Sequence, residues 1–220
     1  MQNTNKLLAI LIIIFVIITI FNNYAIHSAL SITGQPVGIV GLTILPACEI
    51  GIKQGWNYVS LCAIPSNNSV PSVLSGINYR YIMVWNESSQ DFGIYSPRAA
   101  DPPFDDWDTN KSHFIYYYDA SPTVMYVPGT LYDDLNLSLI QGWNPPTYPY
   151  LLTTSILRYL DSINNSYRYM MKWNYTPQEF IIYSPRAAIP QFTAIDQGQG
   201  QFILMKNADI LEYNESALGT

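Results

Sequence analysis

The residues whose types and spacing could bind a metal ion lie in one acidic loop, DPPFDDWDTN. Within it, Asp106, Asp108 and Asn110 have the 1-3-5 oxygen spacing of a calcium-binding loop. Lys111 stands where such a loop has its turn glycine, and Tyr117 where it has its bidentate carboxylate. The spacing is therefore only a weak calcium candidate. The loop acids are expected to be solvated, and no metal site is predicted.

Two further residues near this loop could take part in catalysis or sugar binding. His113 is the only histidine beyond the N-terminal leader, and no nucleophile elbow accompanies it, so neither a Ser/His/Asp triad nor a two-histidine zinc site is expected. We predict that His113 is a half-exposed structural residue. Trp107, beside the carboxylates, could stack on a sugar only if its ring is exposed. The sequence therefore predicts no enzyme and no cofactor.

An internal repeat dominates the rest of the chain. The longest identical stretch, IYSPRAA, occurs at residues 94–100 and again at 182–188, and shorter matches keep the same spacing of 87–88 residues. These matches are residues 54–57 with 141–144 (QGWN), 79–81 with 167–169 (YRY), and 85–86 with 173–174 (WN). The chain is therefore predicted to contain two copies of one module, residues 47–134 and 135–220.

Each copy predicts several short strands and one short helix. The apolar faces of the two predicted helices are Val70, Val73, Leu74 and Ile77 in the first copy, and Ile156, Leu157, Leu160 and Ile163 in the second. Ser69 and Thr154 are the predicted N-caps. This pattern predicts a mainly β fold of the β-rich α+β class, built as two tandem repeats after an extended N-terminal tail strand.

The repeated Ser-Pro-Arg-Ala-Ala segment is interpreted as the end of a strand, because Pro97 and Pro185 cannot donate to a sheet. Arg98 and Arg186 are expected to bond freed carbonyls or a carboxylate of their own module. The candidate carboxylates are Asp91 and Asp108 in the first copy, and Glu179 and Asp196 in the second. Trp56 and Trp143 are predicted to be core anchors. This structural interpretation is favoured over a duplicated active site.

The N-terminus has the features of a secretory signal peptide. One lysine precedes a continuous apolar run at residues 7–21, and small residues follow near 28–29, which predicts a signal peptide over residues 1–28. A retained anchor is the alternative, although a spanning helix needs about 20 apolar residues. Without this leader, nine Lys and Arg face sixteen Asp and Glu with no basic cluster, so no nucleic-acid partner is expected. Membrane contact is expected only during export.

Two further features are consistent with export. Cys48 and Cys62 flank a stretch that could form a hairpin, and in an oxidising exterior they are predicted to form a disulfide, with two buried free thiols as the alternative. The chain also contains seven Asn-x-Ser/Thr sequons, whose N-linked glycans would supply hydrophilicity to a chain with few charges. They are Asn67, Asn86, Asn110, Asn136, Asn164, Asn174 and Asn214.

Residues 29–46 have no counterpart in the repeat. Within them Val40, Leu42 and Ile44 alternate with smaller residues as in a strand, and no charged residue occurs. An uncharged apolar strand needs a cover. It could pair within its own chain, insert into a neighbouring subunit as a donor strand, or belong to a membrane-associated leader. The donor-strand residues would be Ile32, Val37, Ile39, Val40, Leu42 and Ile44.

The order of these motifs resembles a tandem GWN-type module of secreted archaeal and bacterial surface proteins. The motifs are Gly-Trp-Asn, a Ser/Thr-started helix, Val-Trp, a Ser-Pro turn and a late G-x-G-x-F-I strand. Residues 198–203 keep this last element, residues 110–115 have lost its glycines, and Pro145-Pro146 interrupt the main strand of the second copy. The resemblance implies a cell-surface setting and no known chemistry.

The layout of leader, apolar tail and sequon-bearing β-rich head is similar to archaeal thread-type filament subunits built by donor-strand complementation. A head-to-tail contact that does not close produces a filament. We therefore expect a secreted, N-glycosylated, non-enzymatic filament subunit that polymerises with itself. The alternative is a monomeric surface or S-layer-associated module that binds carbohydrate or protein.

Overall fold

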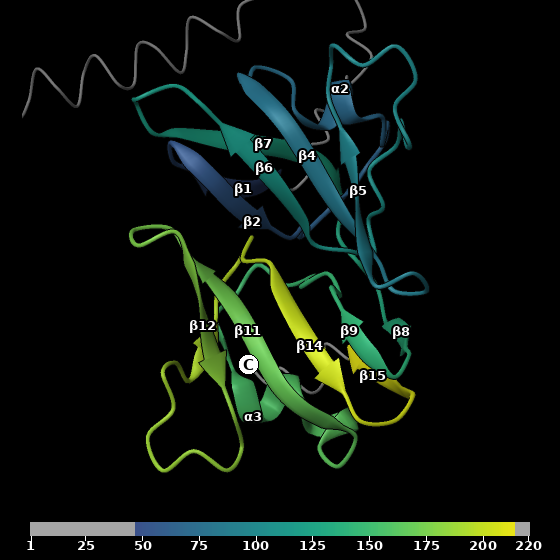
Figure 1. Ribbon diagram of the computed structural model, residues 1–220, viewed down its shortest axis with the longest axis vertical. Coiled ribbons are helices and arrows are strands. Elements are labelled where there is room, and N and C mark those ends of the chain that lie inside the picture. The colour runs from purple at the N-terminus through teal and green to yellow at the C-terminus, as the bar shows by residue number, and fades with distance from the viewer. Residues whose placement is uncertain (1–46, 214–220) are drawn as a thin grey trace, which may run out of the picture. The chain divides into compact units, whose positions relative to one another are not determined.

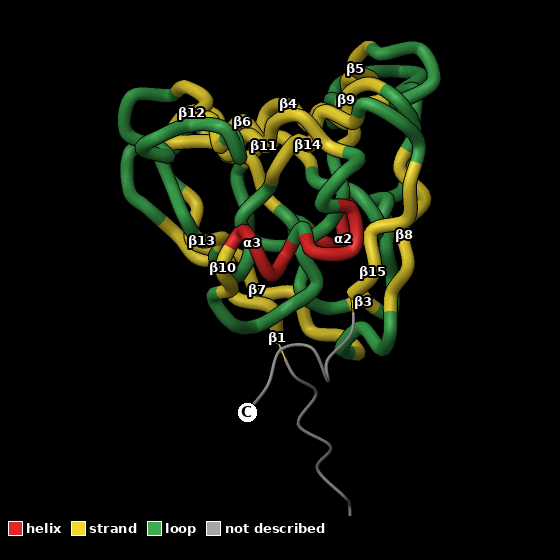
Figure 2. The backbone as a smooth tube through the Cα atoms, turned by 90° about the horizontal axis from the view of Figure 1, so that it is seen from below, coloured by secondary structure: helices red, strands yellow, loops and turns green. Residues whose placement is uncertain are grey.

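A computed structural model describes residues 47–213 of the chain. The predicted signal peptide (1–28), the tail (29–46) with its six proposed donor-strand residues, and residues 214–220 lie outside the described residues. All of the described residues belong to one compact unit. Strands hold 47% of the described residues and helices 7%, which confirms the β-rich α+β class. Figure 2 shows how few residues are helical.

The first module contains two antiparallel sheets and one short helix (Figure 1). The four-stranded sheet has the order β2 (Gly55–Val59), β6 (His113–Tyr117), β4 (Tyr79–Asn86) and β5 (Asp91–Tyr95). The second sheet has the order β1 (Ala47–Ile52), β7 (Thr123–Thr130) and β3 (Ile64–Pro65). Helix α2 is a single turn, Val70–Val73.

The second module repeats this topology. Its four-stranded sheet has the order β9 (Gly142–Asn144), β14 (Gln201–Met205), β11 (Tyr167–Asn174) and β12 (Glu179–Tyr183). Strand β8 (Leu135–Leu139) pairs with β15 (Asp209–Tyr213), as β1 does with β7. The remaining elements are β10 (Thr154–Ser155), β13 (Ala194–Ile195), helix α3 (Ile156–Tyr159) and a 3-10 turn η1 (Asp161–Ile163). The sequence repeat is thus also a repeat of strand order.

The helix faces were predicted correctly in the first module and partly wrongly in the second. Val70, Val73, Leu74 and Ile77 are all buried, at positions i, i+3, i+4 and i+7. The same positions in the second module hold Ile156, Tyr159, Leu160 and Ile163, which are also buried. Leu157 lies one position off this face and is 72% exposed. The N-cap of α3 is Ser155, the residue after the predicted Thr154, because the helix begins at Ile156.

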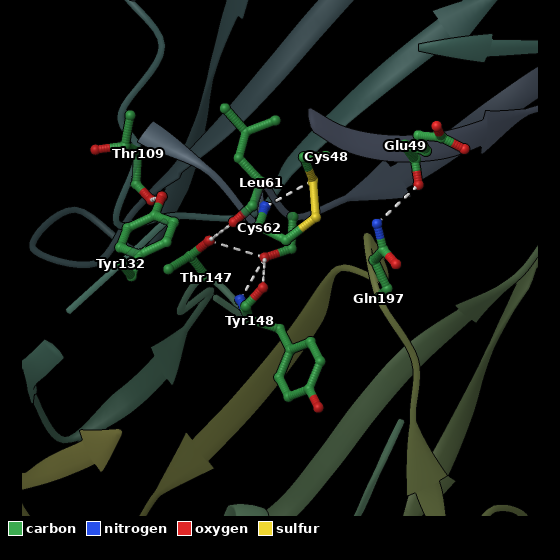
Figure 3. The surroundings of a disulfide bond; sticks show 10 residues. Cys48, Glu49, Leu61, Cys62, Thr109, Tyr132, Thr147, Tyr148 and Gln197 are labelled. Atoms are coloured by element: carbon green, nitrogen blue, oxygen red, sulfur yellow. Dashed lines mark hydrogen bonds between the residues drawn. A yellow bond between two sulfur atoms is a disulfide. The ribbon is translucent and has the colours of Figure 1, made fainter. Parts of the chain in front are cut away.

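The predicted disulfide between Cys48 and Cys62 is confirmed, but not the hairpin that was expected to form it. Strand β1 pairs with β7 and strand β2 pairs with β6, so β1 and β2 form no hairpin with each other. Cys62 lies in the link between β2 and β3, and the disulfide therefore ties β1 to this link. Figure 3 shows that the second module reaches this region, where the Thr147 hydroxyl donates to Leu61 O at 3.1 Å. The disulfide therefore lies beside a contact between the modules.

Replacing both cysteines by alanine should lower the free energy of unfolding by about 3 kcal/mol, because the disulfide closes a loop of about 15 residues in the unfolded chain. Urea unfolding with and without reductant measures this difference. Reductant should lower the stability of the unmodified chain and leave the double variant unchanged. Equal stability of the oxidised chain and the double variant would contradict the prediction.

Candidate functional site

The four-stranded sheets of the two modules share a cluster of aromatic side chains, called the aromatic layer below. At its centre the Tyr58 ring lies between Phe114 on β6 and Phe202 on β14, with centroid distances of 4.2 and 4.9 Å. The other aromatic members are Trp56, Trp85, Phe92, Trp143, Trp173 and Phe180. Phe114 and Phe202 are equivalent residues of the repeat, so the layer joins matching faces of the two copies.

Reciprocal backbone hydrogen bonds show that the two modules are related by an approximate two-fold axis. Ser60 N–H donates to Gly198 O at 3.1 Å, and Gly200 N–H donates to Tyr58 O at 2.9 Å. The equivalent bonds in the opposite direction are Thr147 N–H to Asn110 O at 2.9 Å and Ser112 N–H to Pro145 O at 2.7 Å. Each module therefore gives and receives the same pair of bonds.

The repeated tryptophans form a second reciprocal set. Trp173 Nε1 donates to Trp56 O at 2.8 Å, and the Gln178 side chain accepts from Trp56 N at 2.7 Å and donates to Trp56 O at 3.1 Å. Trp85 and Gln90 make the same three bonds to Trp143 in the other direction. Trp56 and Trp143, predicted to be core anchors, thus anchor the contact between the modules.

This contact also explains the glycine that precedes each of these tryptophans. Gly55 has φ +93° and Gly142 has φ +106°, a region that side chains disfavour. A Cβ on Gly55 would lie 2.6 Å from the Gln178 side-chain oxygen, and one on Gly142 would lie 2.8 Å from that of Gln90. A glycine is therefore favoured before each tryptophan whose backbone binds the glutamine of the opposite module.

The acidic loop packs against helix α2 and does not expose its tryptophan. Val70 N–H donates to Asp105 O at 2.9 Å and Trp107 N–H donates to Asn68 O at 2.7 Å, which fixes the loop beside helix α2. Trp107 is 1% exposed, so its ring cannot stack on a sugar. It packs instead on His113, with ring centroids 4.1 Å apart.

His113 is fully buried, which corrects the prediction of a half-exposed residue. Its Nδ1 lies 3.1 Å from Lys111 O, so Nδ1 carries the proton and donates it, while Nε2 has no hydrogen-bond partner within the described part of the chain. Burial lowers the pKa of His113 to about 3. The imidazole is therefore neutral at physiological pH and structural in its contacts.

The calcium candidate gains no support. Within residues 47–213 no three His, Cys, Asp or Glu side chains come close enough together to hold a metal ion. The Asp108 carboxylate instead lies 3.6 Å from Lys111 Nζ and accepts from Asn110 N–H at 3.0 Å. Lys111 in turn pairs with Glu87 at 2.6 Å. Asp106, Asp108 and Asn110 are therefore loop residues with local partners or solvent exposure.

The sequons that can be placed lie on the surface. Five of their asparagines are exposed and Asn174 is half-buried, while Asn214 lies outside the described residues. The five are Asn67, Asn86, Asn110, Asn136 and Asn164. N-glycosylation at these positions stays a prediction.

The repeated YRY and SPR segments come together in each module and line a cleft. Residues 79–81 of β4 and 96–98 after β5 line the first cleft, which has a volume of about 770 Å³. Residues 167–169 of β11 and 184–186 after β12 line the second cleft, of about 320 Å³. Tyr116 and Tyr118 also line the first cleft, and Lys206 lines the second.

In each cleft, one of the two arginines is the extra residue of a β-bulge. Strand β4 skips one residue, Arg80, where its pairing with β6 passes from Tyr79 to Tyr81. Strand β11 skips Arg168 in the same way where it pairs with β14. A bulge redirects the side chain of the extra residue and is frequent beside binding sites. The repetition of YRY is visible in the sequence, but the bulge that displaces its arginine is not.

The second arginine of each cleft follows the strand end. Strands β5 and β12 stop at Tyr95 and Tyr183, directly before Ser-Pro, as the sequence predicts. The expected partners of Arg98 and Arg186 are wrong, because neither of the two ion pairs among residues 47–213 contains an arginine. Serine holds the turns instead: Arg98 N–H donates to Ser96 Oγ at 3.4 Å, and the equivalent bond measures 3.3 Å. The guanidinium groups are left exposed.

No family model, curated protein or solved structure matches this chain. The resemblances drawn from the motifs therefore stay predictions. Of the helices in residues 47–213, none has the length and apolar character needed to cross a membrane.

Proposed function

We propose that this chain is a secreted, N-glycosylated, non-enzymatic subunit of an extracellular filament, polymerised by insertion of residues 29–46 into a neighbouring subunit. The observation that carries the proposal is that the described sheets are open and end in edge strands, among them β1, β3, β5 and β12. Edge strands present unpaired backbone groups to which an added strand can bind. The uncharged strip of residues 29–46 leads directly into edge strand β1.

Deleting residues 29–46 is expected to abolish filaments while leaving the secreted head folded. Negative-stain microscopy and size-exclusion chromatography of the deleted and full chains would measure assembly, and urea unfolding would measure stability of the head. Val40→Asp and Leu42→Asp should block assembly in the same way, because each buries a charge. Gly41→Ser, between them, is the matched control and should assemble. Normal filaments from the deleted chain would rule out the donor strand, and a large loss of head stability would indicate pairing within one chain.

A second role, as a surface module that binds carbohydrate or protein, is favoured by one observation. The two clefts repeat the same two exposed arginines beside the same tyrosine positions, and among residues 47–213 no ion pair or hydrogen bond of the arginine side chains accounts for this identity. This role is compatible with assembly and needs no enzyme chemistry.

A further inference from the structure

Folding does not explain why the two modules share the exposed arginine of the SPR segments. Pro97 and Arg98 are exposed, as are their equivalents Pro185 and Arg186. Proline ends the strand and serine closes the turn, so both have a structural role. The arginine side chains make no ion pair or hydrogen bond within the described residues. Their identity in two copies that differ at many other positions points to a shared ligand.

The two clefts gather most of the arginine in the protein. The chain has five arginines, and four of them line the clefts: Arg80 and Arg98 in the first, Arg168 and Arg186 in the second. The net charge of the whole chain is −6, so two arginines in one cleft give it a positive charge that is unusual for this chain. An unpaired guanidinium presents a planar fork that binds carboxylate or sulfate through two parallel hydrogen bonds.

Aromatic side chains provide the remaining part of each cleft. The Arg80 guanidinium lies over the Tyr81 ring at 5.2 Å, and the Tyr81 and Tyr116 rings are 6.4 Å apart. Tyr118 is 49% exposed at the same cleft, and Tyr169 is 38% exposed at the second. A tyrosine ring has an apolar face and a polar hydroxyl. It can therefore bind a ligand that has one apolar face and hydroxyl groups around its edge. A pyranose ring has this character.

We propose that the two clefts are equivalent binding sites for an acidic saccharide. The sugar ring rests on Tyr81 in the first cleft or Tyr169 in the second, and its carboxylate or sulfate is bound by the two arginines of that cleft. The volumes fall within the range of natural ligand sites, with room for a longer segment in the first cleft. The proposal makes the second role named above specific, and it does not depend on filament assembly.

The clefts differ in a way that predicts different preferences. Lys206 lines the second cleft where the first has Tyr118, its equivalent in the repeat. A third cation favours the more highly charged ligand, so the second cleft is expected to prefer sulfated saccharides. In the first cleft, Asn78 donates to Asp119 at 3.0 Å, which places a carboxylate at the rim and disfavours a second anionic group there.

Isothermal titration of the full chain with defined tetrasaccharides tests the proposal. The probes are a uronic-acid tetrasaccharide, a sulfated tetrasaccharide, a neutral tetrasaccharide of the same length, and inorganic sulfate. Both acidic saccharides should bind with two sites per chain and weaken as salt is raised, while the neutral saccharide and free sulfate should not bind. Equal binding of the neutral saccharide, or binding of free sulfate alone, would overturn the proposal.

Arginine variants assign the binding to the clefts. Arg98→Gln and Arg186→Gln should each weaken binding about tenfold or more at one of the two sites, and the double variant should weaken binding at both. Arg158→Gln is the matched control, because Arg158 is the one arginine outside the clefts and is also exposed. Unchanged binding in the double variant, or an equal loss in the control, would overturn the assignment.

The same variants separate this proposal from filament assembly. The double arginine variant should still form filaments, and the chain lacking residues 29–46 should still bind acidic saccharides as a monomer. If a sulfated tyrosine peptide binds the clefts and neither acidic saccharide does, the ligand is a peptide and the saccharide proposal is wrong. Circular dichroism melts of each variant should match the unmodified chain, since all three substituted arginines are exposed.

Discussion

Tyr58→Ala should lower the free energy of unfolding by about 3–5 kcal/mol, the range for removing a buried aromatic side chain. The Tyr58 ring is 1% exposed and lies between Phe114 and Phe202, so its loss empties the centre of the aromatic layer between the modules. Because this layer joins the two copies, unfolding followed by tryptophan fluorescence should also become less cooperative. Urea denaturation monitored by fluorescence and by circular dichroism measures both effects.

Two variants control for this prediction. Tyr58→Phe keeps the ring and removes only the hydroxyl that donates to Gln201 O at 3.2 Å, so a loss of about 1 kcal/mol is expected. Tyr118→Ala removes a tyrosine that is 49% exposed and should change stability by less than about 0.5 kcal/mol. A loss in Tyr58→Ala no larger than that in Tyr118→Ala would show that the layer does not hold the modules together.

Acid should destabilise the protein through His113, by about 4 kcal/mol between pH 6.5 and pH 3. Burial lowers the pKa of this imidazole from 6.5 to about 3, so the folded chain holds the neutral form and the unfolded chain binds the proton first. The stability is fully present above pH 6.5 and is lost progressively as the pH falls toward 3. Protonation would also place an N–H on Nε2, which has no acceptor among the described residues.

The repeat supplies a matched control for the acid effect. Gln201 occupies in the second module the position that His113 holds in the first, so His113→Gln replaces the titrating group by the residue that the same fold already accepts. Urea unfolding at a series of pH values should show a shallower decline for this variant between pH 6.5 and 3. Carboxylates contribute equally to both chains and cancel in the difference. Parallel pH profiles would contradict the assigned role of His113.

Much of the fold within each module could be predicted from the sequence, because strand patterns and strand-ending prolines act locally. Strands β4 and β11 begin with YRY, and β5 and β12 stop before Ser-Pro, as expected. The phase of helix α3 was missed because a single helical turn gives too few apolar positions to fix its buried face.

The contacts between the modules could not be predicted from the sequence. Comparing the two copies shows which structural features they share, but it does not show which residues of one module contact the other. Gln178 bonds to Trp56, 122 residues away, and no local pattern links these positions. The sequence also left open whether the Trp107 ring is buried. Its acidic neighbours indicate a solvated loop, whereas backbone bonds to residues near helix α2 draw the ring inward.

The place of Tyr58 near the approximate two-fold axis has a consequence for how the protein can change. The second copy has Pro145 where the first has Tyr58, and a proline there also shortens β9 relative to β2. A tyrosine at position 145 would clash with the Tyr58 ring, which already fills the space between Phe114 and Phe202. The two modules are thus complementary at this position, and we expect that a chain made of two first modules would not pack in the same way.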